Sequence, residues 1–200
     1  MAMDRVAAQK AIASFLRALG RDPDVEPELL GTPARVVDAW VDELIDGYDV
    51  DISAMLAAES SPAPADRAGL VALRGLAVST MCPHHLLPAR GTATVLYLPG
   101  RLVAGFGTIA RLVDAWSHRL TLQEAIGVHV ATSLVELLGA HGAACRLSMS
   151  HRCLTARGRR QTAALVDTIA FAGTFGRPGP DRDLALQALS QPAPAPEQAP

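Results

Sequence analysis

Hydrophobic residues recur along this chain at two spacings, first helical and then strand-like. From Asp4 to Leu19 they fall three or four residues apart and stop at Gly20, a residue common at helix ends, so this stretch predicts an amphipathic helix. A second helix is predicted over residues 33–48, with Thr32 as its cap and Pro33 in its first turn. Both helices come before any strand-like stretch.

Residues 51–68 lack a clear periodicity, and the run SSPAPA at residues 60–65 predicts a flexible loop. Beyond Gly69, alternation and β-branched residues predict strands. Helical spacing returns in two stretches, and Thr121 with Glu124 matches a capping box at the start of the second. The predicted strands cover residues 70–78, 91–98, 144–154 and 161–172, with a short one within 101–106, and the predicted helices cover 109–118 and 121–138.

Helices grouped beside strands at hairpin spacing indicate an α+β fold with an antiparallel sheet. The chain of 200 residues suits one domain with appendages. We therefore predict an N-terminal helical region with a flexible loop (residues 1–68), an α+β domain (69–176) and a disordered tail rich in Pro, Ala and Gln (177–200).

Charge and cysteine content narrow the class of protein. A formal charge of -2 gives no electrostatic case for binding nucleic acid or an anionic membrane surface. The start of the chain lacks a signal-like apolar run, and no stretch is long and apolar enough to span a membrane, so a cytoplasmic protein is expected. Two of the three cysteines lie beside histidines, which favours metal ligation over disulfides, while Cys145 is expected in the core.

Two short runs concentrate the chain's metal-binding side chains: Cys82, His84 and His85 in the first, and His151 and Cys153 in the second. A catalytic zinc takes three protein ligands and keeps a fourth position for water, so the surplus histidines would be free to transfer protons. If residues 147–154 form a strand, His151 and Cys153 share a face. The alternative is that the cysteines are small buried hydrophobes and the histidine pair a surface loop.

These and other runs resemble the GTP cyclohydrolase I family in order and spacing, from about Gly31 to Gly173. They are TPARV at residues 32–36, DEL at 42–44, CPHHLLP at 82–88, YLP at 97–99, VAG at 103–105, RLV at 111–113, QE at 123–124 and HRCLTARG at 151–158. The resemblance implies the tunnelling fold (T-fold), in which units of a four-stranded sheet and two helices assemble into a homo-oligomeric ring, typically a decamer, with active sites between subunits.

The resemblance also implies roles for individual residues. Cys82, His85 and Cys153 would bind Zn²⁺, and His84 and His151 would transfer protons. Glu124, with Gln123 beside it, would hold the guanine edge, since a carboxylate accepts two parallel donors; capping of the helix is the structural alternative for Glu124. Arg35, Arg111 and Arg157 match phosphate contacts.

The activity implied is hydrolysis of the imidazole ring of GTP. Zinc would supply hydroxide near pH 7 for attack at C8, His151 would protonate N7, and His84 would serve as a second proton donor or acceptor. C8 would leave as formate, and rearrangement would give dihydroneopterin triphosphate, a precursor of pterins and tetrahydrofolate.

The departures from the family pattern concern mainly the phosphates. Gly107-Thr108 stands where the family usually has Ser-Lys, Asp38 where it usually has another lysine, and Pro83 where it usually has Glu. Losing the two lysines weakens a triphosphate site, because each charged hydrogen bond contributes about 1.5 to 3 kcal/mol. We therefore keep two alternatives: a related hydrolase that acts on a guanine compound with fewer phosphates or stops at the ring-opened intermediate, and a non-catalytic subunit that binds pterin or purine. Arg101, Arg159 or Arg160 could instead replace the missing cations, with GTP as the substrate.

Overall fold

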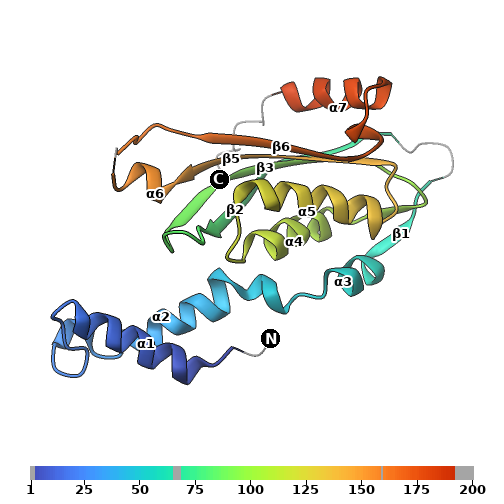
Figure 1. Ribbon diagram of the computed structural model, residues 1–200. Coiled ribbons are helices and arrows are strands. Elements are labelled where there is room, and N and C mark those ends of the chain that lie inside the picture. The colour runs from blue at the N-terminus through green and yellow to red at the C-terminus, as the bar shows by residue number, and fades with distance from the viewer. Residues whose placement is uncertain (1–2, 65–68, 159, 192–200) are drawn as a thin grey trace, which may run out of the picture. The chain divides into compact units, whose positions relative to one another are not determined.

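The computed structural model describes residues 3–64, 69–158 and 160–191, and Figure 1 shows its elements in chain order. The chain divides into two compact units, one ending at Asp46 and the other beginning at Gly47. In the described part of the chain, the first unit is helical and the strands lie in the second.

The first unit begins with α1 (Arg5–Ala18), which matches the predicted helix and is capped by Asp4 through the backbone N–H of Ala7. A short 3₁₀ turn, η1 (Pro27–Leu29), leads to α2 (Thr32–Ala39). The predicted cap is wrong by one residue: Gly31, at φ 74°, is the N-cap of α2, and Thr32 already lies within the helix. Glycine fits this position because a left-handed backbone is costly for other residues.

The predicted long helix over residues 33–48 is interrupted. After α2 the chain continues as a π-helical segment, η2 (Trp40–Leu44), and then as a 3₁₀ turn, η3 (Asp46–Asp49). Arg5 of α1 holds this region by donating to Asp38 at 3.0 Å and by pairing with Asp42. That guanidinium lowers the pKa of the Asp42 carboxyl below its usual value.

The second unit starts with elements that the sequence did not predict. α3 (Ile52–Ala58) is capped by Asp51, and it buries Ile52, Met55 and Leu56 in the main core. β1 (Ser60–Pro62) pairs with β4 (Leu102–Ala104) in the antiparallel direction. The prediction of a flexible loop at residues 60–65 is therefore wrong for β1, because a partner strand distant in sequence supplies its hydrogen bonds. Residues 65–68 lie outside the described residues.

The main sheet has four antiparallel strands in the order β2-β3-β5-β6. They are β2 (Val71–Met81), β3 (Pro88–Leu98), β5 (Gly142–His151) and β6 (Val166–Gly173). Gly91 of β3 lies so close to β5 that an added Cβ would come within 1.9 Å of the Ser148 carbonyl oxygen. At the end of the sheet, Met81 pairs with Pro88 and Ala89 pairs with His151.

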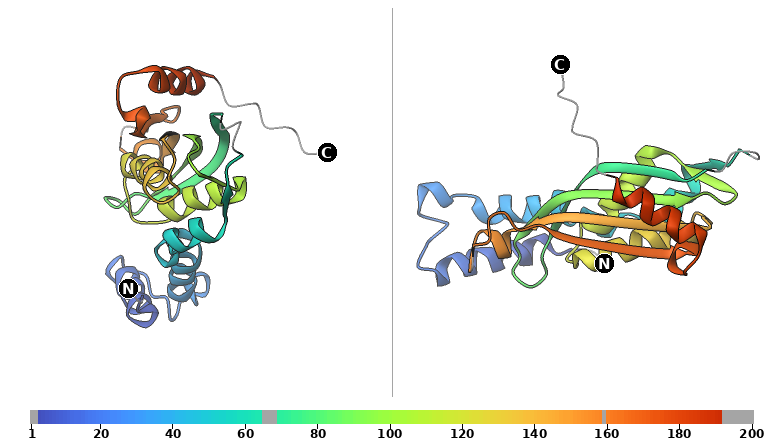
Figure 2. Two further views of the ribbon diagram at one scale, coloured as in Figure 1. Left: turned by 90° about the vertical axis from the view of Figure 1, so that its right-hand side faces the viewer. Right: turned by 90° about the horizontal axis from the view of Figure 1, so that it is seen from above.

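Two helices, α4 (Phe106–Ser117) and α5 (Gln123–Glu136), cover one face of this sheet (Figures 1 and 2). Alternate residues of β3 and β5 point into the core beneath them, which also contains Ile109, Leu112, Ile126, Val130 and Leu134 of the two helices. The predicted capping box is wrong: α5 starts at Gln123, and its N-cap, Leu122, makes no side-chain capping bond. A short helix, α6 (Arg152–Thr155), follows β5 directly.

The opposite face of the sheet carries α7 (Pro180–Ser190), preceded by the turn η4 (Thr174–Gly176) (Figure 2). Ala185 and Leu189 of α7 pack against Leu96 and Ala144 of the sheet and against Phe175. The prediction of a disordered tail is therefore corrected for residues 180–190, where Pro180 and acidic residues in the first turn start a helix that buries apolar side chains. Residues 192–200 lie outside the described residues.

The α+β class with an antiparallel sheet is confirmed by these elements. The four strands with two long helices on one face also match the unit expected for the tunnelling fold. Within the described residues, no helix has the length and apolar character needed to cross a membrane.

Candidate functional site

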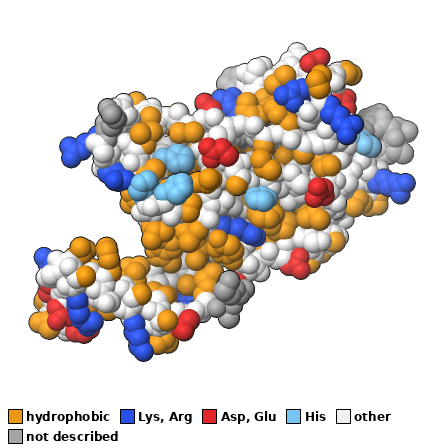
Figure 3. Space-filling view, in the orientation of Figure 1, with side chains coloured by type: hydrophobic (Ala, Val, Ile, Leu, Met, Phe, Trp, Pro, Cys, Tyr) orange, Lys and Arg blue, Asp and Glu red, His pale blue; other side chains and the backbone are white. Residues whose placement is uncertain are grey.

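A pocket of about 290 Å³ opens in the second unit, at the end of the sheet where β2 and β5 finish. Its lining brings together the predicted metal ligands, the two predicted proton-transfer histidines, and both residues of the Gln-Glu pair; these are Cys82, His85, Cys153, His84, His151, Gln123 and Glu124. Figure 3 shows histidine side chains gathered at one place on this face of the molecule.

The turn after β2 places two of these side chains together. The backbone N–H of Leu86 donates to the Cys82 carbonyl at 2.9 Å, and the N–H of Cys82 donates to the Leu87 carbonyl at 3.0 Å. Leu86 has φ 52°, a left-handed conformation that costs free energy for a non-glycine residue. The resulting tight turn brings Nδ1 of His85 to 3.8 Å from Sγ of Cys82.

Cys153 completes the cluster from α6. The prediction that it shares a strand face with His151 is wrong, because β5 ends at His151 and the chain turns at once into α6. Both side chains nevertheless line the pocket. Burial and the neighbouring Cys82 raise the pKa of the Cys153 thiol, whereas the positive charge of Arg157 lowers it.

The cluster has the chemistry of a zinc site. The ligand atoms of Cys82, His85 and Cys153 all lie within 4.8 Å of one another. Two thiols and one imidazole are donors that zinc takes in proteins, and three protein ligands leave a fourth position open. A cation there would also offset the cost of ionising two neighbouring thiols. The residues present therefore fit a zinc ion.

His84 lies beside this group without belonging to it. Its ring is exposed and lies 6.2 Å from that of His85, at an interplanar angle of 85°. Because it lines the same pocket, it can reach a molecule bound there without being one of the three clustered ligand residues. This geometry suits a group that exchanges protons with solvent and ligand.

His151 is half-buried and is hydrogen-bonded to Gln123, with Nε2 at 2.7 Å from Oε1 of the amide. Burial lowers the pKa of His151, and the negative charge of Glu124 opposes that effect. The amide group of Gln123 reaches across to the sheet and is only 3% exposed. The sequence singled out Gln123 and His151 but gave no sign that they contact each other.

Glu124 occupies the first turn of α5 and is exposed at the pocket. Since no capping box forms, its carboxylate is not used to close the start of the helix. A carboxylate at the N-terminal end of a helix is stabilised by the helix dipole, and it can accept two parallel N–H donors. The structure thus removes the capping alternative for this residue.

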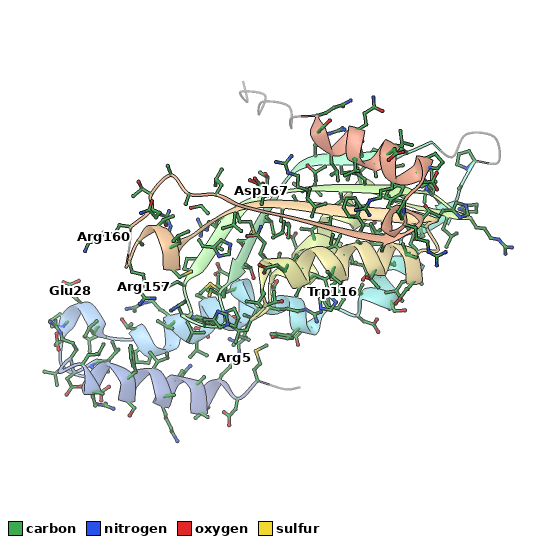
Figure 4. All side chains as sticks on the ribbon, turned by 45° about the horizontal axis from the view of Figure 1, so that its top comes forward. Arg5, Glu28, Trp116, Arg157, Arg160 and Asp167 are labelled. Carbon is green, nitrogen blue, oxygen red and sulfur yellow. The ribbon has the colours of Figure 1, made fainter. Side chains whose placement is uncertain are left out.

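The three arginines predicted to contact phosphate do not line this pocket. Among the described residues that line the pocket, none is Arg35, Arg111 or Arg157. Arg35 belongs to the first unit, where it donates to the Leu30 carbonyl and to Oγ1 of Thr32, each at 2.9 Å. Arg157 is exposed just after α6 and is labelled in Figure 4.

Arg111 of α4 forms an ion pair with Glu59, a residue that the sequence did not single out. The other oxygen of Glu59 accepts from the Thr108 hydroxyl at 2.9 Å. Thr108 is the residue that stands at the family's usual lysine position, and here it is 5% exposed. Glu59 follows α3 within a stretch without periodicity, so no sequence signal connected it with Arg111.

Fold and pocket together define a class of protein: an α+β enzyme with a Cys/His metal-type site at the end of an antiparallel sheet. The chain belongs to the GTP cyclohydrolase I family, whose model matches residues 8–190. The predictions of this family and of an enzyme of this hydrolase type are confirmed.

Curated relatives carry the name GTP cyclohydrolase 1. The protein from Chromobacterium violaceum is 41% identical over 189 residues, which cover 94% of this chain and 89% of the relative. The protein from Leifsonia xyli subsp. xyli is 40% identical over 181 residues, covering 90% and 93%. The protein from Rickettsia bellii is 33% identical over 168 residues, covering 84% and 86%.

Among solved structures, the archaeosine synthase QueF-Like in the apo form superposes with a TM-score of 0.42 at 17% sequence identity. The match covers 52% of this chain and 93% of that chain.

Proposed function

We propose that this protein opens the imidazole ring of GTP by hydrolysis, releasing C8 as formate and giving dihydroneopterin triphosphate. The observation that carries the proposal is the convergence of Cys82, His85 and Cys153 with two further histidines and Glu124 in one pocket. The relatives named GTP cyclohydrolase 1, similar over most of their length, support it.

Cys82, His85 and Cys153 would hold a zinc ion, which when bound lowers the pKa of water toward neutrality and so makes a nucleophile available. Glu124 would accept from N1–H and the exocyclic amine of guanine and so fix the base in the pocket. His151, when its ring carries a proton on both nitrogens, would donate one to N7, which makes C8 more electrophilic. His84, exposed beside the ligands, would return protons during ring opening.

The bonds balance as two hydrolyses followed by a condensation. One water adds at C8 and the C8–N9 bond breaks, and a second water releases C8 as formate. Rearrangement of the ribose and ring closure then return one water. The product class would feed pterin and tetrahydrofolate synthesis, and the unpaired thiols suit a reducing, cytoplasmic compartment.

The phosphate region supports a second candidate, a guanine substrate with fewer phosphates. Arg111 is already paired with Glu59, and Thr108 donates to that same carboxylate. Asp38, at another usual lysine position, pairs with Arg5. Arg35 and Arg157 remain as phosphate-binding candidates, together with Arg111 if a phosphate displaces Glu59. Each missing charged hydrogen bond would lower triphosphate affinity by about 1.5 to 3 kcal/mol.

One assay separates the candidates. Zinc-loaded protein is incubated with GTP, GDP, GMP and guanosine, and formate and pterin fluorescence are followed separately. We expect both signals from GTP. Formate from GMP but not from GTP would favour the second candidate, formate without fluorescence would mean that the reaction stops at the ring-opened stage, and no formate from any compound would favour a binding subunit.

Two variants test the division of roles within the pocket. We expect Cys153→Ala to lose zinc, because it removes one of three ligands. His151→Ala should keep the zinc content of the parent protein and lose at least about 100-fold in kcat, the usual scale for a general acid. Atomic absorption on the purified proteins measures the metal, and loss of zinc from His151→Ala would contradict this assignment.

A further inference from the structure

The carboxamide of Gln123 can be oriented without ambiguity. One of its terminal atoms lies 3.2 Å from the Leu147 carbonyl, 2.8 Å from the Val166 carbonyl and 3.1 Å from Oγ1 of Thr168. Carbonyl oxygens accept and cannot donate, so the atom that faces them must be the NH₂ group. The amide oxygen is therefore the atom at 2.7 Å from Nε2 of His151.

This orientation fixes the hydrogen on the imidazole. An amide oxygen only accepts, so the short contact requires Nε2 of His151 to carry a proton. The neutral ring is then protonated at Nε2 and unprotonated at Nδ1, and the opposite tautomer would place two acceptors against each other. The hydrogen bond a ring nitrogen makes is what selects the tautomer of a histidine.

The surroundings of Gln123 suit a residue that orients His151 better than a residue that contacts a substrate. Its side chain is 3% exposed, and its donors are directed to β5 and β6 while its own backbone begins α5. It therefore spans three elements, and the position of its oxygen is set by the sheet. Glu124, the next residue, is the exposed member of the pair at the pocket.

We infer that Gln123 is a positioning residue that holds His151 in the Nε2-protonated tautomer and leaves Nδ1 as its proton-exchanging nitrogen. The inference rests on the proposed function only for its effect on turnover; the tautomer itself follows from the contacts. It replaces the earlier expectation that Gln123 helps to hold the guanine edge.

The test uses Gln123→Met, which keeps the length of the side chain and removes both the acceptor and the donors. Full-length zinc-loaded protein is labelled with ¹⁵N at histidine, sedimented and studied by magic-angle-spinning spectroscopy at pH 8. The His151 signals are identified by their absence in His151→Ala. We expect a single Nε2-protonated ring in the parent protein and a mixture of tautomers in Gln123→Met.

Kinetics supply the second measurement. We expect kcat of Gln123→Met to fall about 10- to 100-fold, the usual effect of removing a partner that orients a histidine, with KM and zinc content near the parent values. Ser133→Ala is the matched control, because it removes a buried polar contact on the same helix, the hydrogen bond from Trp116, and does not line the pocket. It should change neither the tautomer nor kcat.

Three results would overturn the inference: an Nδ1-protonated ring in the parent protein, an unchanged tautomer in Gln123→Met, or a raised KM with unchanged kcat, which marks a substrate contact. If Gln123→Met does not fold, the spectrum of the parent protein still decides, since the contacts allow one neutral tautomer. A parent protein inactive on every guanine compound would refute the proposed function and leave the spectroscopic result standing.

Discussion

At the scale of single residues, the three cysteines differ because their surroundings differ. Cys82 and Cys153 lie within reach of His85 in the pocket. Cys145 lies in the core on β5 with no exposed surface, as its sequence context predicted, and burial raises the pKa of its thiol to about 12. The first two suit metal binding, whereas Cys145 behaves as a small hydrophobic residue.

The raised pKa of Cys145 predicts a pH dependence of stability. In the unfolded chain this thiol ionises near its ordinary value of 9.0, while the folded protein holds the proton up to about 12. Its contribution is therefore fully present below pH 9 and is lost as pH rises toward 12. Between pH 8 and pH 10 the parent protein should lose about 1 kcal/mol more of its unfolding free energy than Cys145→Ala does.

Urea unfolding of both zinc-loaded proteins at the two pH values provides the measurement. Cys145→Ala should be less stable at pH 8 because a core side chain is shortened, but its stability should fall less steeply. Parallel losses in the two proteins would show that Cys145 does not hold its proton in the folded state.

The sequence predicted the residues of the site through their type and spacing, and it failed where a turn of the backbone or the packing of distant segments decides. The pairs of Cys and His in two runs were enough to predict that Cys82, His85 and Cys153 lie together as a metal-type cluster. The placement of Cys153 on α6 depends on the turn of the backbone directly after His151. The contact between Gln123 and His151 and the pairing of Arg111 with Glu59 depend on how distant segments pack. No local pattern of apolar residues contains that information.

At the scale of elements, long periodic stretches were predicted well and short elements were not. The sheet and α1, α4 and α5 have clear hydrophobic patterns, and their bounds differ from the predictions by a few residues. β1 and α7 lack such patterns. β1 is held by hydrogen bonds to β4, and α7 is held by apolar contact and by Arg74 and Arg146, which donate to the carbonyls of Ala188 and Leu189.

The packing of α7 gives a matched pair of variants. Leu189 is 4% exposed and lies against the sheet, whereas Leu186 on the same helix is 43% exposed. Leu189→Ala should lower the unfolding free energy by about 2 to 3 kcal/mol, because a buried leucine leaves a cavity. Leu186→Ala should change it by about 0.5 kcal/mol or less, since the lost surface is largely solvated.

Chemical denaturation of the two variants measures this difference directly. Equal losses would mean that α7 does not pack on the sheet in solution through Leu189. The comparison controls for helix propensity, because both variants replace leucine by alanine within α7.

At the scale of the whole molecule, β2 and β6 are the edge strands of the sheet, and within the described residues each pairs with a strand on one side only, apart from an isolated bridge between Met81 and Leu120. Apolar side chains such as Leu165 and Ile169 are exposed at the β6 side. Open edges and exposed apolar residues commonly pair with further chains. We therefore keep the prediction of a homo-oligomeric ring, and a decamer would have about ten times the chain mass of 21.0 kDa.

Native mass spectrometry of the zinc-loaded protein, with light scattering as an independent measure, tests the assembly. A discrete species near the mass of ten chains is expected, and subunits should exchange slowly if strand edges are shared. A monomer at micromolar concentration would contradict the ring and would leave the pocket to be completed by this chain alone.

Cys82 and His85 lie in the tight turn after β2, and Cys153 lies in α6 after β5. The stretch of chain between these two places is long and includes β3, α4 and α5. An ion held by all three would tie those ends together in the folded chain, and because the unfolded chain has no preformed site, the free energy of binding would add to the stability of the fold. Removing the ion would then stop catalysis and would also free the ends of β2 and β5 at the pocket. The availability of the metal would therefore also set the stability of the folded enzyme.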